Sequence, residues 1–167
     1  MKSTIMGATV FLITCGFYMT GLMPSLGAGD SGELITAGYT LGIAHSPGYP
    51  LFVLGGRLFS GLLPWANPGY QMNMFSLVCA AATVALLGLI FLHIVNNMFA
   101  AVTMILFSLS MPGMWKSATQ TEVFALNALI AVVILWLMIV KEKPYVDRRV
   151  DRLVCFLAGI SLGNQHT

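Results

Sequence analysis

Residues 71–94 read QMNMFSLVCAAATVALLGLIFLHI and contain no Asp, Glu, Lys or Arg. A helix needs about 20 mostly apolar residues to cross the hydrocarbon core of a bilayer, and this stretch is long enough. The whole chain has the same character, because 57% of its residues are hydrophobic and 8% are charged, whereas soluble domains carry about 25% charged residues. The sequence therefore predicts an all-α integral membrane protein. Its net charge of +2 is too small for a nucleic-acid-binding surface.

Residues 71–94 are the second of five segments that we expect to cross the membrane. The first apolar segment also fits a signal peptide, but it is longer than the 7–15 residues or so of a signal core, so we expect it to remain as a spanning helix. The third is short because Pro112 follows it. The other four expected segments are residues 5–23, 98–111, 123–140 and 153–163.

The connection between the first two segments, residues 24–70, is neither lipid-like nor low in complexity. We expect two short helices in it, at residues 31–43 and 51–63, because the prolines between them interrupt any longer helix. The second carries Arg57 and ends near Trp65, a residue type that suits the headgroup level. The sequence thus predicts a structured exoplasmic loop with two short interfacial helices.

The basic residues set the expected orientation. Lys2 precedes the first segment, and five more basic residues lie between the fourth and fifth. The positive-inside rule makes that side, and the N-terminus, cytoplasmic. The loop of residues 24–70, the link of residues 115–122 and the tail after Gly163 then share the exoplasmic side, which predicts a site at the outer surface of a membrane, with the bacterial inner membrane as the expected location. The five basic residues are Lys141, Lys143, Arg148, Arg149 and Arg152.

The loop begins with an acidic stretch, Gly29-Asp30-Ser31-Gly32-Glu33. Asp30 and Glu33 have the spacing of a capping box at a helix start. Acidic residues close to lipid are also costly and usually mark function, so we favour a catalytic base, with the choice between the two left open. The residues around Ser31 also resemble the motifs of chymotrypsin-like and rhomboid serine proteases. The sequence has no soluble all-β pattern, and Ser31 lies in a loop instead of inside a span, so we do not favour a protease.

Other polar residues each have a structural and a functional interpretation. Thr119 and Glu122 fit a capping box. A helix end capped in this way would still place Glu122 at the predicted site on the outer surface of the membrane. His45 and His166 lack the close ligand spacing of a metal site, so we expect no metal. Arg57 fits either snorkelling to lipid headgroups or a bidentate grip on a phosphate.

Five motifs in order carry a resemblance to a known family. They are residues 29–35, 41–51, 73–76, 121–127 and 163–167. Through them the chain resembles the protein O-mannosyltransferase-like membrane family, formerly a domain of unknown function, which is similar to the GT-C glycosyltransferases. The chain departs from the family pattern at Ser46 and Gln165. The resemblance covers the N-terminal part of family members, so we expect a single transmembrane domain, residues 1–167, that is a fragment of a longer protein.

The resemblance implies a glycosyltransferase with a catalytic acid in the first outward loop, a polyprenyl-phosphate donor of mannose, and a Ser/Thr hydroxyl acceptor on a protein. Carried onto this chain, it makes Asp30 the base and Glu33 the second choice, with no cofactor or divalent metal. The alternatives are a transporter or lipid flippase, which should place charges inside its spans, and a purely structural membrane subunit. The residues expected to contact substrate are His45, Arg57, Lys116, Glu122, Asn164, Gln165 and His166.

Overall fold

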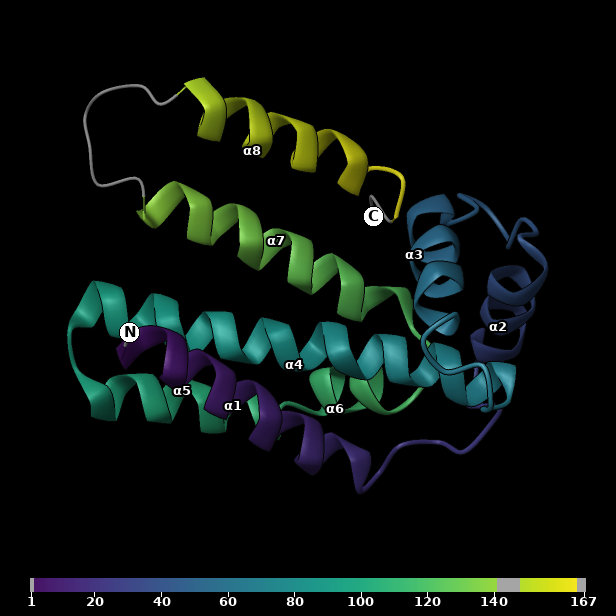
Figure 1. Cartoon of the computed structure of the whole chain (residues 1–167), viewed down its shortest axis with the longest axis horizontal. Coiled ribbons are helices and arrows are strands. Elements are labelled where there is room, and N and C mark those ends of the chain that lie inside the picture. The colour runs from purple at the N-terminus through teal and green to yellow at the C-terminus, as the bar shows by residue number, and fades with distance from the viewer. Residues whose placement is uncertain (1, 141–147, 165–167) are drawn as a thin grey trace.

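A computed structural model describes residues 2–140 and 148–164 of the chain. These residues form eight helices and no strand, which confirms the predicted all-α class. The helices are α1 (Lys2–Met19), α2 (Ser31–Thr40), α3 (Pro50–Ser60), α4 (Pro68–Val95), α5 (Met98–Ser110), α6 (Pro112–Thr119), α7 (Val123–Val140) and α8 (Arg148–Ser161). The helices α1, α4, α5, α7 and α8 lie along one another in alternating directions, while α2 and α3 cover one end (Figure 1).

Helix α4 is the element around which the others pack, because it contacts α1, α2, α3, α5, α6 and α7. It is apolar on all sides, as expected for a buried helix. Its start is well defined, since Pro68 occupies the first turn and the Asn67 side chain accepts the N–H of Tyr70 at 2.9 Å. It ends at Asn96 in the left-handed conformation.

The two short helices expected in the first loop are present as α2 and α3. Both pack on the start of α4, where the side chain of Met72 lies between Gly38 and Gly56. A Cβ at Gly38 would lie 2.7 Å from the Met72 methyl, and one at Gly56 would lie 2.5 Å from it. The absence of a Cβ at both positions therefore allows the two helices to approach α4 closely.

The link expected at residues 115–122 is mostly helical, which corrects the sequence-based interpretation. Pro112 ends α5 and opens α6, and the two helix axes differ by 65°. Thr119 closes α6, and its hydroxyl donates to the carbonyl of Trp115 at 2.9 Å. The capping box predicted for Thr119 and Glu122 is therefore wrong, because Thr119 ends one helix instead of starting the next.

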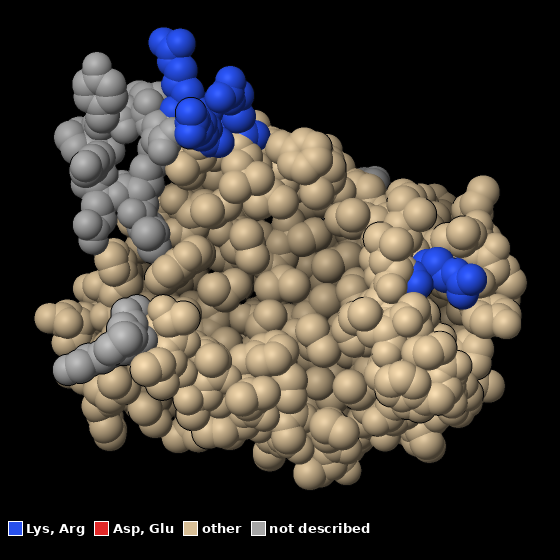
Figure 2. Space-filling model, in the orientation of Figure 1, with Lys and Arg blue, Asp and Glu red and all other residues tan. Residues whose placement is uncertain are grey.

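Among the described residues, α4 is the one helix that is long and apolar enough to cross a membrane, and the bent pair α5 and α6 adds a second if it is one span. Helices α1, α3 and α7 are apolar but shorter. Helix α8 starts at Arg148, five residues before the expected start, so charged residues occupy its first turns. Helix length and composition alone thus do not establish five spans. Lys and Arg side chains gather where α8 begins, whereas only one small basic patch is visible where α2 and α3 lie (Figure 2).

Candidate functional site

The polar segments expected on one side of the membrane meet at one end of the helix bundle. The N–H of Met23, after α1, donates to the carbonyl of Thr119 at 2.8 Å. The N–H of Leu51, in α3, donates to the carbonyl of Gly163 at 3.2 Å. Alternating helix directions produce this convergence, because the ends of α1, α6 and α8 and the starts of α4 and α7 all lie there (Figure 1). The first loop, the α6–α7 connection and the end of α8 thus form one surface.

Asp30 lies on this surface as the N-cap residue of α2. Its side chain makes no capping hydrogen bond and is exposed, so the capping box predicted for Asp30 and Glu33 is wrong. Gly29, with φ of 67°, makes the turn that presents it. The hydrogen bond with Glu33 is the largest cause that raises the pKa of His45, and the negative charge of Asp30 adds to it. The turn that carries Asp30 also meets the α6–α7 connection, because the Gln120 side chain bonds to the backbone of Ala28.

Glu33 has a different role, because both of its carboxylate oxygens are engaged by His45. The backbone N–H of His45 donates to Oε1 at 2.6 Å, and Nδ1 lies 2.9 Å from Oε2. On the other side of the ring, Nε2 lies 3.1 Å from the hydroxyl of Tyr49. The side-chain hydrogen bond between them lowers the pKa of Glu33 and raises that of His45. His45 is thus held in one orientation by Glu33 and Tyr49.

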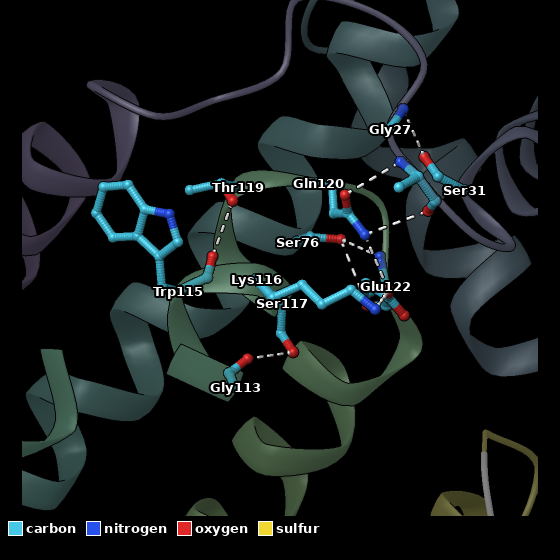
Figure 3. A network of polar contacts seen from close by, with 11 residues as sticks. Gly27, Ser31, Ser76, Gly113, Trp115, Lys116, Ser117, Thr119, Gln120 and Glu122 are labelled. Atoms are coloured by element: carbon cyan, nitrogen blue, oxygen red, sulfur yellow. Dashed lines mark hydrogen bonds and ion pairs between the residues drawn. The ribbon is translucent and has the colours of Figure 1, made fainter. Parts of the chain in front are cut away.

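Lys116, in α6, forms an ion pair with Glu122, in the connection to α7. The Lys116 Nζ lies 2.9 Å from Glu122 Oε1. Glu122 is 8% exposed in its side chain, whereas Lys116 is 62% exposed. The carboxylate also accepts Gln120 Nε2 at 3.0 Å (Figure 3). Glu122 is therefore buried, and Lys116 is the member of the pair that solvent can reach.

Ser31 is fully buried, and its hydroxyl accepts the N–H of Gly27 at 3.2 Å (Figure 3). A buried hydroxyl that stabilises a turn is not an accessible nucleophile. This geometry agrees with rejecting the protease interpretation of the Gly-Asp-Ser-Gly letters.

The remaining predicted site residues do not join this group. Arg57 lies on the exposed face of α3, 5.7 Å above the ring of Tyr39. Asn164 is fully buried, and its Nδ2 donates to Val123 O at 3.0 Å and to Asn127 Oδ1 at 2.7 Å, so it attaches the end of α8 to α7. The described residues contain no group of three or more His, Cys, Asp or Glu that could hold a metal ion. Gln165 and His166 lie outside the described residues.

Sequence reasoning missed two amides that hold the first loop in place. The Gln120 side chain bonds to the backbone of Ala28. Its Oε1 accepts the Ala28 N–H and its Nε2 donates to the Ala28 carbonyl, both at 3.3 Å. Asn73 is fully buried at the start of α4, and its Nδ2 donates to the carbonyls of Met23 and Ser25 at 2.8 and 2.7 Å. A signal for Asn73 is present in the sequence, because an amide in an apolar helix needs hydrogen-bond partners from other segments.

Residues 30–167 match the protein family described as "Protein O-mannosyl-transferase TMEM260 N-terminal domain". The chain belongs to this family. The resemblance found in the five motifs is therefore confirmed, together with its placement in the N-terminal part of TMEM260-type proteins.

Two curated relatives of this TMEM260 family are similar to nearly the whole chain. The "Protein O-mannosyl-transferase tmem260" of Dictyostelium discoideum is 30% identical over 99% of the chain. The "Protein O-mannosyl-transferase TMEM260" of Mus musculus is 33% identical over 95% of it. The chain spans 22% and 23% of these relatives, and no solved structure matches it. Both relatives are eukaryotic, so the bacterial inner membrane stays a prediction.

Proposed function

We propose that the protein is a membrane glycosyltransferase that moves mannose from a polyprenyl-phosphate donor to a Ser or Thr hydroxyl of an acceptor protein, on the exoplasmic face. Two observations support the reaction class. The relatives are named protein O-mannosyl-transferases. The observation that carries the proposal is the exposed Asp30 carboxylate, which makes no capping hydrogen bond and stands on a turn bonded to Gln120, whose Nε2 donates to the same Glu122 oxygen that Lys116 contacts.

Asp30 is the proposed base. It accepts the proton of the acceptor hydroxyl while the new bond forms between that oxygen and C1 of the sugar. The bond between C1 and the phosphate oxygen breaks, and the polyprenyl phosphate leaves with the electron pair. Glu33 is less suited to this role, because His45 already occupies both of its oxygens.

Lys116 is the proposed partner of the leaving phosphate. It lines a pocket of about 390 Å³ between α6 and α7, whose other lining residues are mostly apolar. An amphiphilic donor fits a cation at the edge of an apolar pocket, with phosphate at the ammonium and prenyl units against the apolar walls. The other lining residues are Met111, Gly113, Met114, Ser117, Phe124 and Ala128.

The proposed membrane topology has five spans, α1, α4, the α5–α6 pair, α7 and α8, with the N-terminus in the cytoplasm. The basic first turns of α8 lie at the end of the bundle opposite to α2 and α3 (Figures 1 and 2). The positive-inside rule then puts the Asp30 surface outside. A lipid-linked donor and a protein acceptor would both reach that surface.

The test is transfer from a labelled polyprenyl-phosphate mannose to a Ser/Thr peptide by membranes that carry the full-length protein. Asp30→Asn removes the base without changing the size of the side chain, so we expect a loss of roughly 10²- to 10⁴-fold in rate. Asp151→Asn, the same substitution on α8, is the matched control and should retain activity. Full activity in Asp30→Asn would refute the assignment of the base. Lipid translocation without transfer in the wild type would favour a flippase.

A further inference from the structure

The first loop is held two residues before Asp30 by a reciprocal amide contact. Gln120 Oε1 accepts the N–H of Ala28, and Gln120 Nε2 donates to the carbonyl of the same residue, both at 3.3 Å (Figure 3). The two partners are 92 residues apart in the chain. Gln120 is 4% exposed, so water competes little for these bonds.

The orientation of the Gln120 amide is itself set by neighbours. Glu122 Oε1 accepts the second proton of Nε2 at 3.0 Å, which directs the nitrogen toward the Ala28 carbonyl. Glu122 is in turn attached to α4, because its N–H donates to the hydroxyl of Ser76 at 3.3 Å. Space around the contact is also limited, since a Cβ on Gly27 would lie 2.8 Å from the Gln120 side chain.

The contact reaches the proposed catalytic group through a short and constrained segment. Ala28 and Asp30 are separated by Gly29 alone, whose φ of 67° makes the turn into α2. On the far side, the Ser31 hydroxyl accepts the N–H of Gly27. The backbone that carries Asp30 is therefore held on both sides. Of these contacts, the one with Gln120 joins the residues that are farthest apart in the sequence.

We infer that Gln120 is a positioning residue, which sets the place of the Asp30 carboxylate relative to Lys116 by holding Ala28. The inference rests on the proposed function, because it assigns the purpose of the contact to the transfer reaction. Lys116 and Gln120 donate to the same Glu122 oxygen. Lys116, the proposed phosphate ligand, and Gln120, which holds the loop that carries the base, thus contact the same buried carboxylate of Glu122.

The test is Gln120→Met in the full-length protein, with Gln71→Met as the matched control. Gln71 is 7% exposed, and its Nε2 donates to the carbonyls of Leu63 and Ala66, in the connection between α3 and α4, at 2.8 and 3.0 Å. Both variants remove a buried amide bonded to loop backbone, so a merely structural effect would be similar in the two. A displacement of about 1 Å in a reacting group can cost about 10²-fold in rate. We expect Gln120→Met to lower kcat about 10- to 100-fold, with little change in the donor KM, and Gln71→Met to leave kcat unchanged.

Hydrogen exchange at the Ala28 amide gives a readout that does not depend on activity. We expect faster exchange of a peptide covering residues 24–32 in Gln120→Met and unchanged exchange there in Gln71→Met. Equal kcat in the two variants, or unchanged exchange in Gln120→Met, would overturn the inference. Absence of transfer by the wild type would instead refute the proposed function, and the exchange comparison would then decide by itself whether Gln120 holds the loop.

Discussion

Asn73→Leu should destabilise the fold more than any other single amide change at the Asp30 end of the bundle. The Asn73 side chain is fully buried and makes three hydrogen bonds. Two donate to the carbonyls of Met23 and Ser25, and its Oδ1 accepts the hydroxyl of Thr121 at 2.6 Å. Leu has the same number and branching of side-chain heavy atoms and is somewhat larger, so no cavity forms. At about 1 kcal/mol of net stabilisation for each bond, the expected loss is about 3 kcal/mol, a large part of the 5–15 kcal/mol or so that stabilises a typical domain.

The assay is unfolding of the purified protein in mixed micelles by titration with SDS, followed by circular dichroism. Thr83→Val is the control on the same helix, since Thr83 is 1% exposed and its hydroxyl donates to the Cys79 carbonyl at 2.9 Å within α4. That hydroxyl bonds within its own helix, so the expected loss is below about 0.5 kcal/mol. If Asn73→Leu also lost less than about 0.5 kcal/mol, Asn73 would not connect the first loop to α4 in the way described.

Two further predictions concern the same end of the molecule. The Glu33–His45 contact should be fully formed between pH 4.5 and 6.5, the ordinary pKa values of the two groups. It should weaken as the pH falls through the lowered pKa of Glu33 or rises through the raised pKa of His45. In an NMR titration, Glu33→Gln should lower the pKa of His45, and an unchanged His45 pKa would contradict the contact. Gly69→Ala should lower the free energy of unfolding by roughly 1–3 kcal/mol, because the added Cβ would lie 2.9 Å from the backbone carbon of Ser25. Gly113→Ala is the control and should be neutral or stabilising in the same SDS titration, because nothing lies within 4 Å of its added Cβ. Equal effects of the two substitutions would contradict the packing of Gly69 on Ser25.

The parts of the fold that depend on local composition were predictable. The apolar runs located the helices α1, α4, α5 and α7 to within a few residues, and the prolines separated α2 from α3. Helix α6 was missed because Pro112 indicates a helix end and a helix start equally well. The family resemblance was also readable from the sequence, because its motifs are short contiguous segments.

The partners of the polar side chains were not predictable. Asp30-x-x-Glu33 and Thr119-x-x-Glu122 both have the spacing of a capping box, and neither forms one. Glu33 bonds to a turn 12 residues away, and Glu122 bonds to Lys116. Local spacing decides only which contacts are possible within a helix turn, while competing donors from other segments decide which contacts form.

The sequence by itself determined that this chain is apolar and helical and that it belongs to the O-mannosyl-transferase TMEM260 family, and it limited the expected base to Asp30 or Glu33. Tertiary structure alone decided that Asp30 makes no capping hydrogen bond while Glu33 is engaged, and that Gln120 and Asn73 hold the loop. The physical reason is that apolar burial follows from composition along the chain, whereas hydrogen bonds between distant segments depend on where the packed helices bring their ends together.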